Sequence, residues 1–272
     1  MSEPFDFTFG VEPPAQVGRA LANEDGVLSH AVQSPFQAGE TKIHVLLPQQ
    51  QSERRIRTLY VLPVERFDGH AWGDALAEIR RHGLHNKHHL MCVMPTFSHM
   101  PWYADHPTDP LIRQESYFLN VVMPFVERTY PVPRGGSGRM LLGFSKSGWG
   151  ACSLLLRHPE IFSRAAAWDA PLGQQSPNKY GMREVFPNQS DLDQYCVWDL
   201  LKQQANLLKA SSRLALLGYG VFRGHHQATH YRMMNLGIPH TYEDGPKCEH
   251  HWESGWVSNA INHLANDDGS EA

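Results

Sequence analysis

The sequence lacks long apolar runs, blocks of basic residues and a secretory leader, and each absence excludes a class of protein. No apolar run approaches the ~18 residues that a membrane-spanning helix needs, so we expect no membrane insertion. The formal charge of -4, without a basic cluster, argues against nucleic acid as a partner. The acidic N-terminal stretch, MSEPFDFTFGVEPP, has neither the basic nor the apolar region of a secretory signal, which favours a cytoplasmic location.

Cysteine is scarce: the chain has four, and no two of them form a C-x-x-C pair. Because a domain of this size needs no disulfide bonds for its stability, we expect four reduced thiols. Among the 17 histidines there is neither an H-E-x-x-H motif nor a cysteine–histidine finger spacing. The sequence therefore predicts no metal site and no cofactor.

Apolar runs separated by helical patterns make up most of the chain of 272 residues, 41% of which are apolar. Short continuous apolar runs are typical of buried strands and occur at 58–62, 90–94, 140–144, 165–168 and 214–217. Helical patterns lie between or after them, at 72–82, 114–128, 147–157 and 256–264. This alternation indicates a parallel sheet covered by helices on both faces.

Two segments depart from the alternation. The strand-like runs 27–33 and 41–47, separated by Pro35 and Gly39, indicate an antiparallel start. A polar stretch of roughly 40 residues separates the last two strands, which is too long for a simple connection. We expect one α/β domain over residues 1–272, with a helical cap within 173–205.

The nine residues 143–151, GFSKSGWGA, place a glycine-flanked serine between an apolar run and a helical pattern. A serine on such a strand-to-helix turn stands clear of the sheet, and the N-terminus of the helix stabilises negative charge beside it. The pattern predicts that Ser145 is a nucleophile, although serine is also a favoured helix N-cap. Ser147 stands where the G-x-S-x-G pattern has glycine, so the motif is one residue short of a match.

A serine nucleophile needs a base, which is usually a histidine. The C-terminal segment EHHW offers two candidates, His250 and His251. Both follow the last expected strand, a position that suits a base returning to the nucleophile from a loop.

Several ordered stretches extend the pattern from about residue 42 onward: TLYVLP, VMPTFSHMPWYAD, QESYFLNVVMPFVERTYPV, MLLGFSKSGWGACSLLLRHPEIFSRAAAWD and LGIPHTYEDGPKCEHHWESGW. In these stretches the chain resembles the esterase-D-like family of α/β hydrolases, which also includes feruloyl esterases and mycolyltransferases. The resemblance implies the α/β-hydrolase fold, a three-layer sandwich with a mostly parallel sheet. It also implies hydrolysis of a carboxylic ester through an acyl-enzyme on Ser145. Family members carry a histidine two residues before a tryptophan, which assigns the base to His250.

The acid that orients the base departs from the family pattern, because the position that matches the family's aspartate is Val221. Asp169 stands instead at the C-terminal end of the preceding strand, where catalytic groups collect in such sheets. We therefore predict that Asp169 is the acid. The alternatives are a site without an acid, or one of the carboxylates of Glu243, Asp244, Asp191, Asp193 and Asp199.

The oxyanion donors are a second departure from the family, which commonly has a histidine-glycine pair after the third strand. This chain has Pro63 and Val64 there, followed by Glu65. Because proline has no N–H, we predict that the donors are the backbone N–H groups of Glu65 and Lys146.

An aromatic loop follows the strand expected at 90–94, and its place at a strand end brings it near the nucleophile. We expect Trp102, Tyr103 and Trp149 to contact the substrate, a small-molecule ester whose identity the sequence does not reveal. Two other functions stay open: acyl transfer to an alcohol by the same machinery, and an inactive binding protein on the same fold. The oligomeric state has no signature in the sequence.

Overall fold

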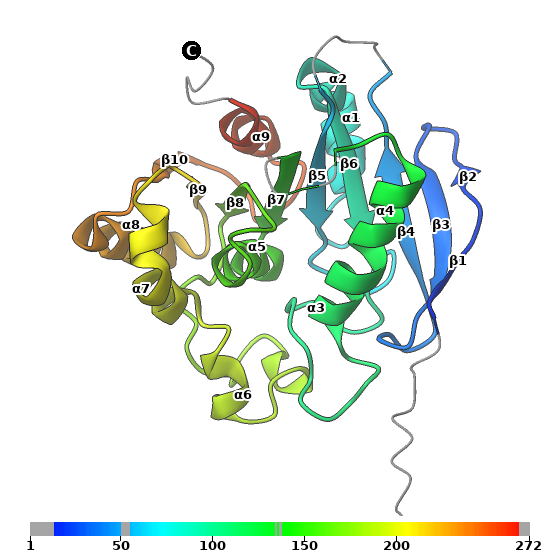
Figure 1. The fold of residues 1–272 in the computed structure, drawn as a ribbon. Coiled ribbons are helices and arrows are strands. Elements are labelled where there is room, and N and C mark those ends of the chain that lie inside the picture. Colours follow the sequence, from blue (N-terminus) through cyan, green and yellow to red (C-terminus); the bar gives the residue numbers. More distant parts are fainter. Residues whose placement is uncertain (1–13, 50–54, 134, 136–137, 267–272) are drawn as a thin grey trace, which may run out of the picture.

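A mixed β-sheet forms the centre of the computed structural model, which describes residues 14–49, 55–133, 135 and 138–266 (Figure 1). Its strands are β1 (Gln16–Val17), β2 (Leu21–Ala22), β3 (Leu28–Gln33), β4 (Glu40–Leu46), β5 (Arg57–Leu62), β6 (Leu90–Pro95), β7 (Arg139–Phe144), β8 (Arg164–Trp168), β9 (Leu214–Tyr219) and β10 (Thr241–Lys247). They lie in the order β1-β3-β4-β6-β5-β7-β8-β9-β10, with β2 paired to β3. Pairings that involve β1 to β4 are antiparallel, and those among β5 to β10 are parallel.

Helices cover both faces of this sheet, as the alternation in the sequence predicts. They are α1 (Ala75–Arg81), α2 (Leu84–Lys87), α3 (Gln114–Tyr117), α4 (Met123–Thr129), α5 (Lys146–Arg157), α6 (Gln189–Asp193), α7 (Val197–Leu208), α8 (Arg223–Leu236) and α9 (Val257–Ala265), with a π turn η1 (Phe118–Val122) and a 3-10 turn η3 (Met182–Glu184). Along β5, Leu59 and Val61 join the apolar cluster beneath α1, α2 and α9. Tyr60 and Leu62 join the cluster beneath α3, α4, α5 and α7. One strand therefore serves two cores, because successive side chains point to opposite faces.

The five strands predicted from continuous apolar runs are present as β5 to β9, and the antiparallel start is present as β3 and β4. The helix predicted over 114–128 is divided into α3, η1 and α4. Two elements had no apolar signal. The strand β10 is a polar, irregular edge strand, and α8 buries only His226, Thr229 and Met233. No helix among the described residues has the length and apolar character required to cross a membrane.

The order of the strands reverses beside β5, which lies between β6 and β7. In open α/β sheets, ligands bind outside the carboxyl ends of the strands at such a reversal. The carboxyl end of β5 leads to Pro63, and that of β7 leads to Ser145. The fold therefore brings the predicted oxyanion loop and the predicted nucleophile to one edge of the sheet.

The long segment between β8 and β9 carries η3, α6 and α7. In Figure 1, α6 and α7 lie on the same side of the sheet as α5. Its buried side chains belong to the same apolar cluster as the helices on that face of the sheet, among them Met182, Phe186, Leu192 and Leu201. This packing fixes the segment against the body of the molecule. Its service as a lid stays a prediction.

Candidate active site

The backbone at Ser145 is strained, with φ 52° and ψ -127° at the junction of β7 and α5. A Cβ on Gly143 would lie 2.2 Å from the carbonyl oxygen of Ser147, so the turn requires glycine there. Ser145 occupies the N-cap position of α5, but its side chain makes no capping hydrogen bond. The strained turn thus holds a serine hydroxyl that helix capping does not use, as in a nucleophile elbow.

Ser147 replaces the usual glycine without disturbing the turn. Its side chain is fully buried, and its hydroxyl accepts a hydrogen bond from the N–H of Phe144 and donates one to the carbonyl of the same residue, both at 2.9 Å. The extra hydroxyl group is therefore satisfied within the elbow itself, which explains why serine is accepted at this position.

Asp169 lies directly after β8, fully buried and in the left-handed region at φ 37°. Its carboxylate accepts hydrogen bonds from the backbone N–H groups of Val221 (2.8 Å) and Phe222 (2.5 Å), at the N-terminus of α8. It is also 2.6 Å from Nδ1 of His250. A Cβ on Gly220 would lie 2.3 Å from Oδ2 of Asp169, so the carboxylate fits only against glycine.

Burial raises the pKa of Asp169, but hydrogen bonds from His250, Phe222 and Val221 lower it further, and the net pKa lies below the ordinary value. The positive end of the α8 dipole favours the same ionised form. Asp169 is therefore a carboxylate at neutral pH, able to hold one tautomer of the imidazole beside it.

Aromatic rings surround the imidazole of His250. Its ring centroid is 4.6 Å from that of Phe144, 5.3 Å from that of Trp72 and 5.9 Å from that of Phe222. Phe144 precedes Ser145, so the imidazole is held next to the elbow. No hydrogen bond joins Ser145 to His250 in this structure, and such bonds are often long before substrate binds.

The other candidates for base and acid are engaged elsewhere. The Nδ1 atom of His251 accepts the N–H of Glu253 at 3.2 Å, and its ring packs against Gly73. Glu243 binds Asn259 and His263, whereas Asp244 pairs with Arg223 at 2.6 Å. Asp191 caps α6 by accepting the N–H of Asn188 at 2.9 Å. Within the described residues, Asp169 is the carboxylate that contacts His250.

The predicted oxyanion donors, Glu65 and Lys146, lie at the ends of β5 and β7, which are neighbours in the sheet. The Glu65 carboxylate turns to the backbone N–H of Trp72 and accepts a hydrogen bond at 3.4 Å. The buried hydroxyl of Tyr103 holds the loop after β5 by donating a hydrogen bond to the carbonyl of Pro63 at 2.6 Å. Burial lowers the pKa of the Lys146 ammonium, although the carboxylates of Glu65 and Glu184 oppose this effect.

The structure places Trp102, Tyr103 and Trp149, the residues predicted to contact the substrate, in the core, so the contact itself stays a prediction. All three side chains are fully buried, and the rings of Trp102 and Trp149 pack edge to face at 5.4 Å. The ring of Tyr103 fills the space beside Gly150, where a Cβ would lie 2.1 Å from it. The aromatic loop therefore supports α5 and the loop after β5 from inside the core. The sequence indicated that this loop lies at a strand end, but it did not indicate that the aromatic rings point into the core.

Two histidines that sequence reasoning did not assign hold the loop after Asp169. The Nε2 atom of His226 accepts the N–H of Ala170 at 2.8 Å, and Nδ1 of His225 accepts the N–H of Gly173 at 3.0 Å. Burial lowers the pKa of His226 to about 4, so it is a neutral acceptor at neutral pH. In the sequence these two histidines are recognisable only as an adjacent pair shortly after the strand expected at 214–217.

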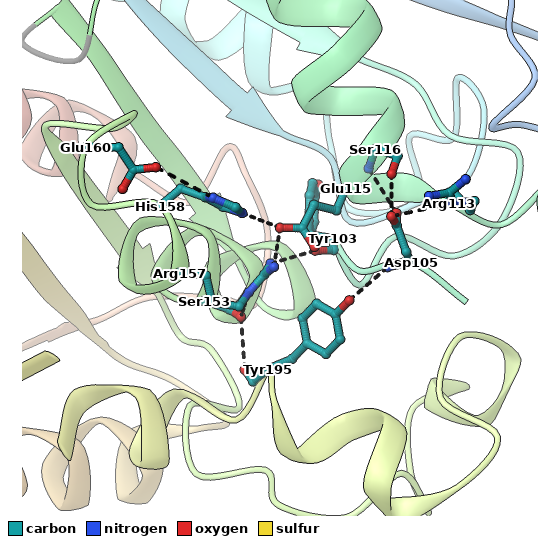
Figure 2. Close-up of polar contacts among 10 residues, drawn as sticks. All are labelled: Tyr103, Asp105, Arg113, Glu115, Ser116, Ser153, Arg157, His158, Glu160 and Tyr195. Carbon is teal, nitrogen blue, oxygen red and sulfur yellow. Dashed lines mark hydrogen bonds and ion pairs between the residues drawn. The ribbon is translucent and has the colours of Figure 1, made fainter. Parts of the chain in front are cut away.

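The far end of α5 is tied down by a buried ionic network, shown in Figure 2. Arg157 and His158 both contact the carboxylate of Glu115 from α3. Arg157 also donates to the carbonyl of Tyr103 at 3.1 Å, and its guanidinium lies 4.3 Å from the ring centroid of Tyr195. The network therefore links α5 to the aromatic loop and to the segment between β8 and β9.

Replacing Glu115 by glutamine is expected to lower the free energy of unfolding by about 3 kcal/mol at pH 7, because it leaves the Arg157 charge without its buried partner. Burial raises the pKa of Glu115, but His158 and Arg157 lower it further, so the folded pKa is depressed. A depressed pKa gives stability that is complete above the unfolded value and is lost as the pH falls through the folded value. Urea denaturation of both proteins at several pH values should show the difference shrinking below about pH 4.

Glu160→Gln is the matched control for this measurement. The Glu160 side chain is 69% exposed, and its distance of 4.0 Å from His158 makes it a weak ion pair. Its effect should stay within about 0.5 kcal/mol at every pH. A difference between wild type and Glu115→Gln that stays constant from pH 7 to pH 3 would contradict the ionic role of Glu115.

Comparisons with known proteins show the family and the fold of this chain. The model of the esterase family described as "Putative esterase" matches residues 34–217. Among solved structures, the fluorophosphonate-binding serine hydrolase FphF of Staphylococcus aureus is 18% identical, with a TM-score of 0.71 over 92% of this chain and 100% of that one. A ferulic acid esterase is 19% identical, with a TM-score of 0.65 over 92% and 96% of the two chains.

The S-formylglutathione hydrolase FrmB of Staphylococcus aureus is 17% identical, with a TM-score of 0.68 over 88% of this chain and 98% of that one. Comparison with curated proteins returned no match. The structural likenesses show a shared fold, which is that of the α/β hydrolases. Since the family model spans most of the chain, the sequence belongs to the Putative esterase family, and the protein is an ester hydrolase built on the α/β-hydrolase fold.

Proposed function

We propose that this esterase cleaves a small-molecule carboxylic ester with a triad of Ser145, His250 and Asp169. The observation that carries the assignment is the buried Asp169 carboxylate, 2.6 Å from Nδ1 of His250 and fixed by two backbone N–H groups. The strained elbow at Ser145, beside Phe144 and the His250 ring, supports the role of the nucleophile. No other pair of a histidine and a buried carboxylate lies beside a strained serine among the described residues.

In the first half of the reaction, Oγ of Ser145 forms a bond to the acyl carbon while Nε2 of His250 takes its proton. Asp169 holds the proton on Nδ1, so that Nε2 is free to accept, and it stabilises the imidazolium that forms. The carbon–oxygen bond to the alcohol then breaks, and His250 returns the proton to the departing oxygen. Water repeats these steps on the acyl-enzyme and releases the carboxylic acid.

The developing oxyanion would be stabilised by the backbone N–H groups of Glu65 and Lys146. Support comes from their positions at the ends of adjacent strands, and from the dipole of α5 directed at the same point. Because both donors are backbone groups, exchange of either side chain should leave the hydrogen bonds in place.

A pre-steady-state burst tests the proposal. With a 4-nitrophenyl ester, wild-type protein should release one equivalent of nitrophenolate per chain before the steady state, because acylation precedes a slower deacylation. Stopped-flow absorbance measures the amplitude, and Ser145→Ala is the blank. Hydrolysis at the same rate in wild type and Ser145→Ala would refute the assignment of the nucleophile.

The cytoplasmic location is kept as part of this proposal. It rests on the four cysteines, all of which are free thiols in the structure. Cellular fractionation of the natural host with an antibody to the protein would test it, and recovery in the secreted fraction would contradict it.

A further inference from the structure

Apolar side chains are exposed along the edge of the site at which His250 lies. Trp72 is 41% exposed, Tyr180 45% and Val221 72%. Phe222 connects them: its ring centroid is 5.6 Å from that of Tyr180 and 5.9 Å from that of His250. We call these four residues the apolar rim. They come from three separate loops: the rings of Trp72 and Phe222 contact His250, Tyr180 packs on Phe222, and Val221 precedes Phe222 in the chain. Exposed apolar residues gathered in this way mark a binding surface more often than scattered ones do.

The backbone of Tyr180 is held in an unfavourable conformation to present this ring. Its φ is 57°, in the left-handed region that large side chains rarely adopt. Within the described residues the phenolic hydroxyl has no hydrogen-bond partner, and the ring contact is with Phe222. Strained residues of this kind cluster where proteins grip ligands.

Trp72 is equally fixed, although its indole is nearly half exposed. Its carbonyl accepts the N–H of Trp252 at 2.9 Å, and its N–H donates to Glu65. The next residue, Gly73, packs so closely on His251 that a Cβ would lie 2.5 Å from that ring. The backbone that carries the indole is therefore fixed, and the ring centroid lies 5.3 Å from that of His250.

Building on the proposed triad, we propose that the apolar rim binds the alcohol portion of the ester, and that this alcohol is an alkyl or aromatic one. The proton that His250 takes from Ser145 must reach the departing oxygen, so this oxygen comes within about 3 Å of the imidazole. The carbon atoms attached to that oxygen then lie against the residues that flank the ring. An apolar alcohol would cover Trp72 and Tyr180, whereas a polar alcohol would lose hydration there.

The proposal has a kinetic consequence that a structural role would not produce. In acylation the carbon–oxygen bond to the alcohol breaks, the alcohol oxygen receives the proton of His250, and the alcohol leaves as a neutral molecule. Deacylation uses water in its place, so the rim has no part in it. Changes in the rim should therefore alter kcat/KM, which reports acylation, and leave the deacylation rate constant as it is.

The test compares esters that share an acyl group. For wild type, kcat/KM for benzyl acetate should exceed that for methyl acetate by about a hundredfold, the discrimination that a few apolar carbons allow. Trp72→Ala and Tyr180→Ser should each lower this ratio by about tenfold, and Trp72→Phe by less. The ratio for methyl hexanoate over methyl acetate, in which only the acyl chain varies, should change by less than about twofold.

Tyr231→Ser is the matched control, because Tyr231 is 63% exposed on α8 and packs on His230 rather than on His250. It should leave both ratios as in wild type. A benzyl-to-methyl ratio that is equal in wild type and the rim variants would overturn the proposal, as would a change confined to the acyl series. Failure of wild type to cleave any of these esters would instead refute the esterase assignment itself.

Discussion

Ser145→Ala and His250→Ala are each expected to lower kcat by about a million-fold, and the double variant should lose no more than either single variant. The nucleophile and the base act as a unit, because the serine is unreactive without a proton acceptor and the histidine has no task without the serine. The residual rate would come from binding and from the oxyanion donors. Steady-state hydrolysis of one activated ester by the three variants measures the effect.

The neighbouring residues provide matched controls. Ser147→Ala removes a serine of the same turn, whose hydroxyl forms both of its hydrogen bonds with the backbone of Phe144. It should cost about 1 kcal/mol of stability and leave kcat within about tenfold of wild type. His251→Ala should behave likewise, because His251 contacts Glu253 and Gly73 instead of Asp169. Losses that add in the double variant, or that appear in these controls, would contradict the proposed pair.

Asp169→Asn should lower kcat by about 10,000-fold with little change in KM. Asparagine has nearly the same shape, but it lacks the negative charge that stabilises the imidazolium, and its amide can favour the wrong tautomer of His250. The wild-type carboxylate is ionised from pH 6 to pH 8, because the pKa of Asp169 lies below its ordinary value, so the substitution removes a full negative charge over this range.

Asp244→Asn is the control for this change. Asp244 is the other aspartate near the histidine loop, and it pairs with Arg223 on the surface. Its replacement should leave kcat within about threefold, since exposed ion pairs contribute about 0–1 kcal/mol. If Asp244→Asn were the more damaging substitution, Asp169 would be a structural residue and the acid would have to be sought again.

Much of the site could be predicted because its signals are local. Ser145 stands in a short motif between a buried strand and a helix, and the paired histidines follow the last strand. Asp169 could be located at the edge of the sheet, because the carboxyl ends of parallel strands meet there. These inferences need only the periodicity of the chain and the direction of its strands.

The support for Asp169 could not be predicted in the same way. The resemblance assigns the family's aspartate position to Val221, and in the fold Val221 supplies a backbone N–H to Asp169 instead. Gly220 leaves the space that the carboxylate occupies. Backbone donors and free space depend on the path of the chain, which side-chain patterns do not reveal.

The exposure of the aromatic residues could not be predicted from the sequence either. Trp102 and Trp149 are buried, whereas Trp72 is exposed beside His250 and Tyr180 is exposed beside Phe222. The sequence contains no periodic pattern around any of these rings that separates one group from the other. Their exposure depends on how three loops pack against each other across the sheet.

Labelling with a fluorophosphonate probe tests the central claim most directly, because the probe reacts with a serine only when that serine is activated. Intact mass should show one adduct per chain, and peptide mapping should find it on Ser145. The adduct should be absent from Ser145→Ala, form far more slowly with His250→Ala, and form normally with Ser147→Ala. An adduct on another residue, or none on folded wild-type protein, would contradict an activated nucleophile at Ser145.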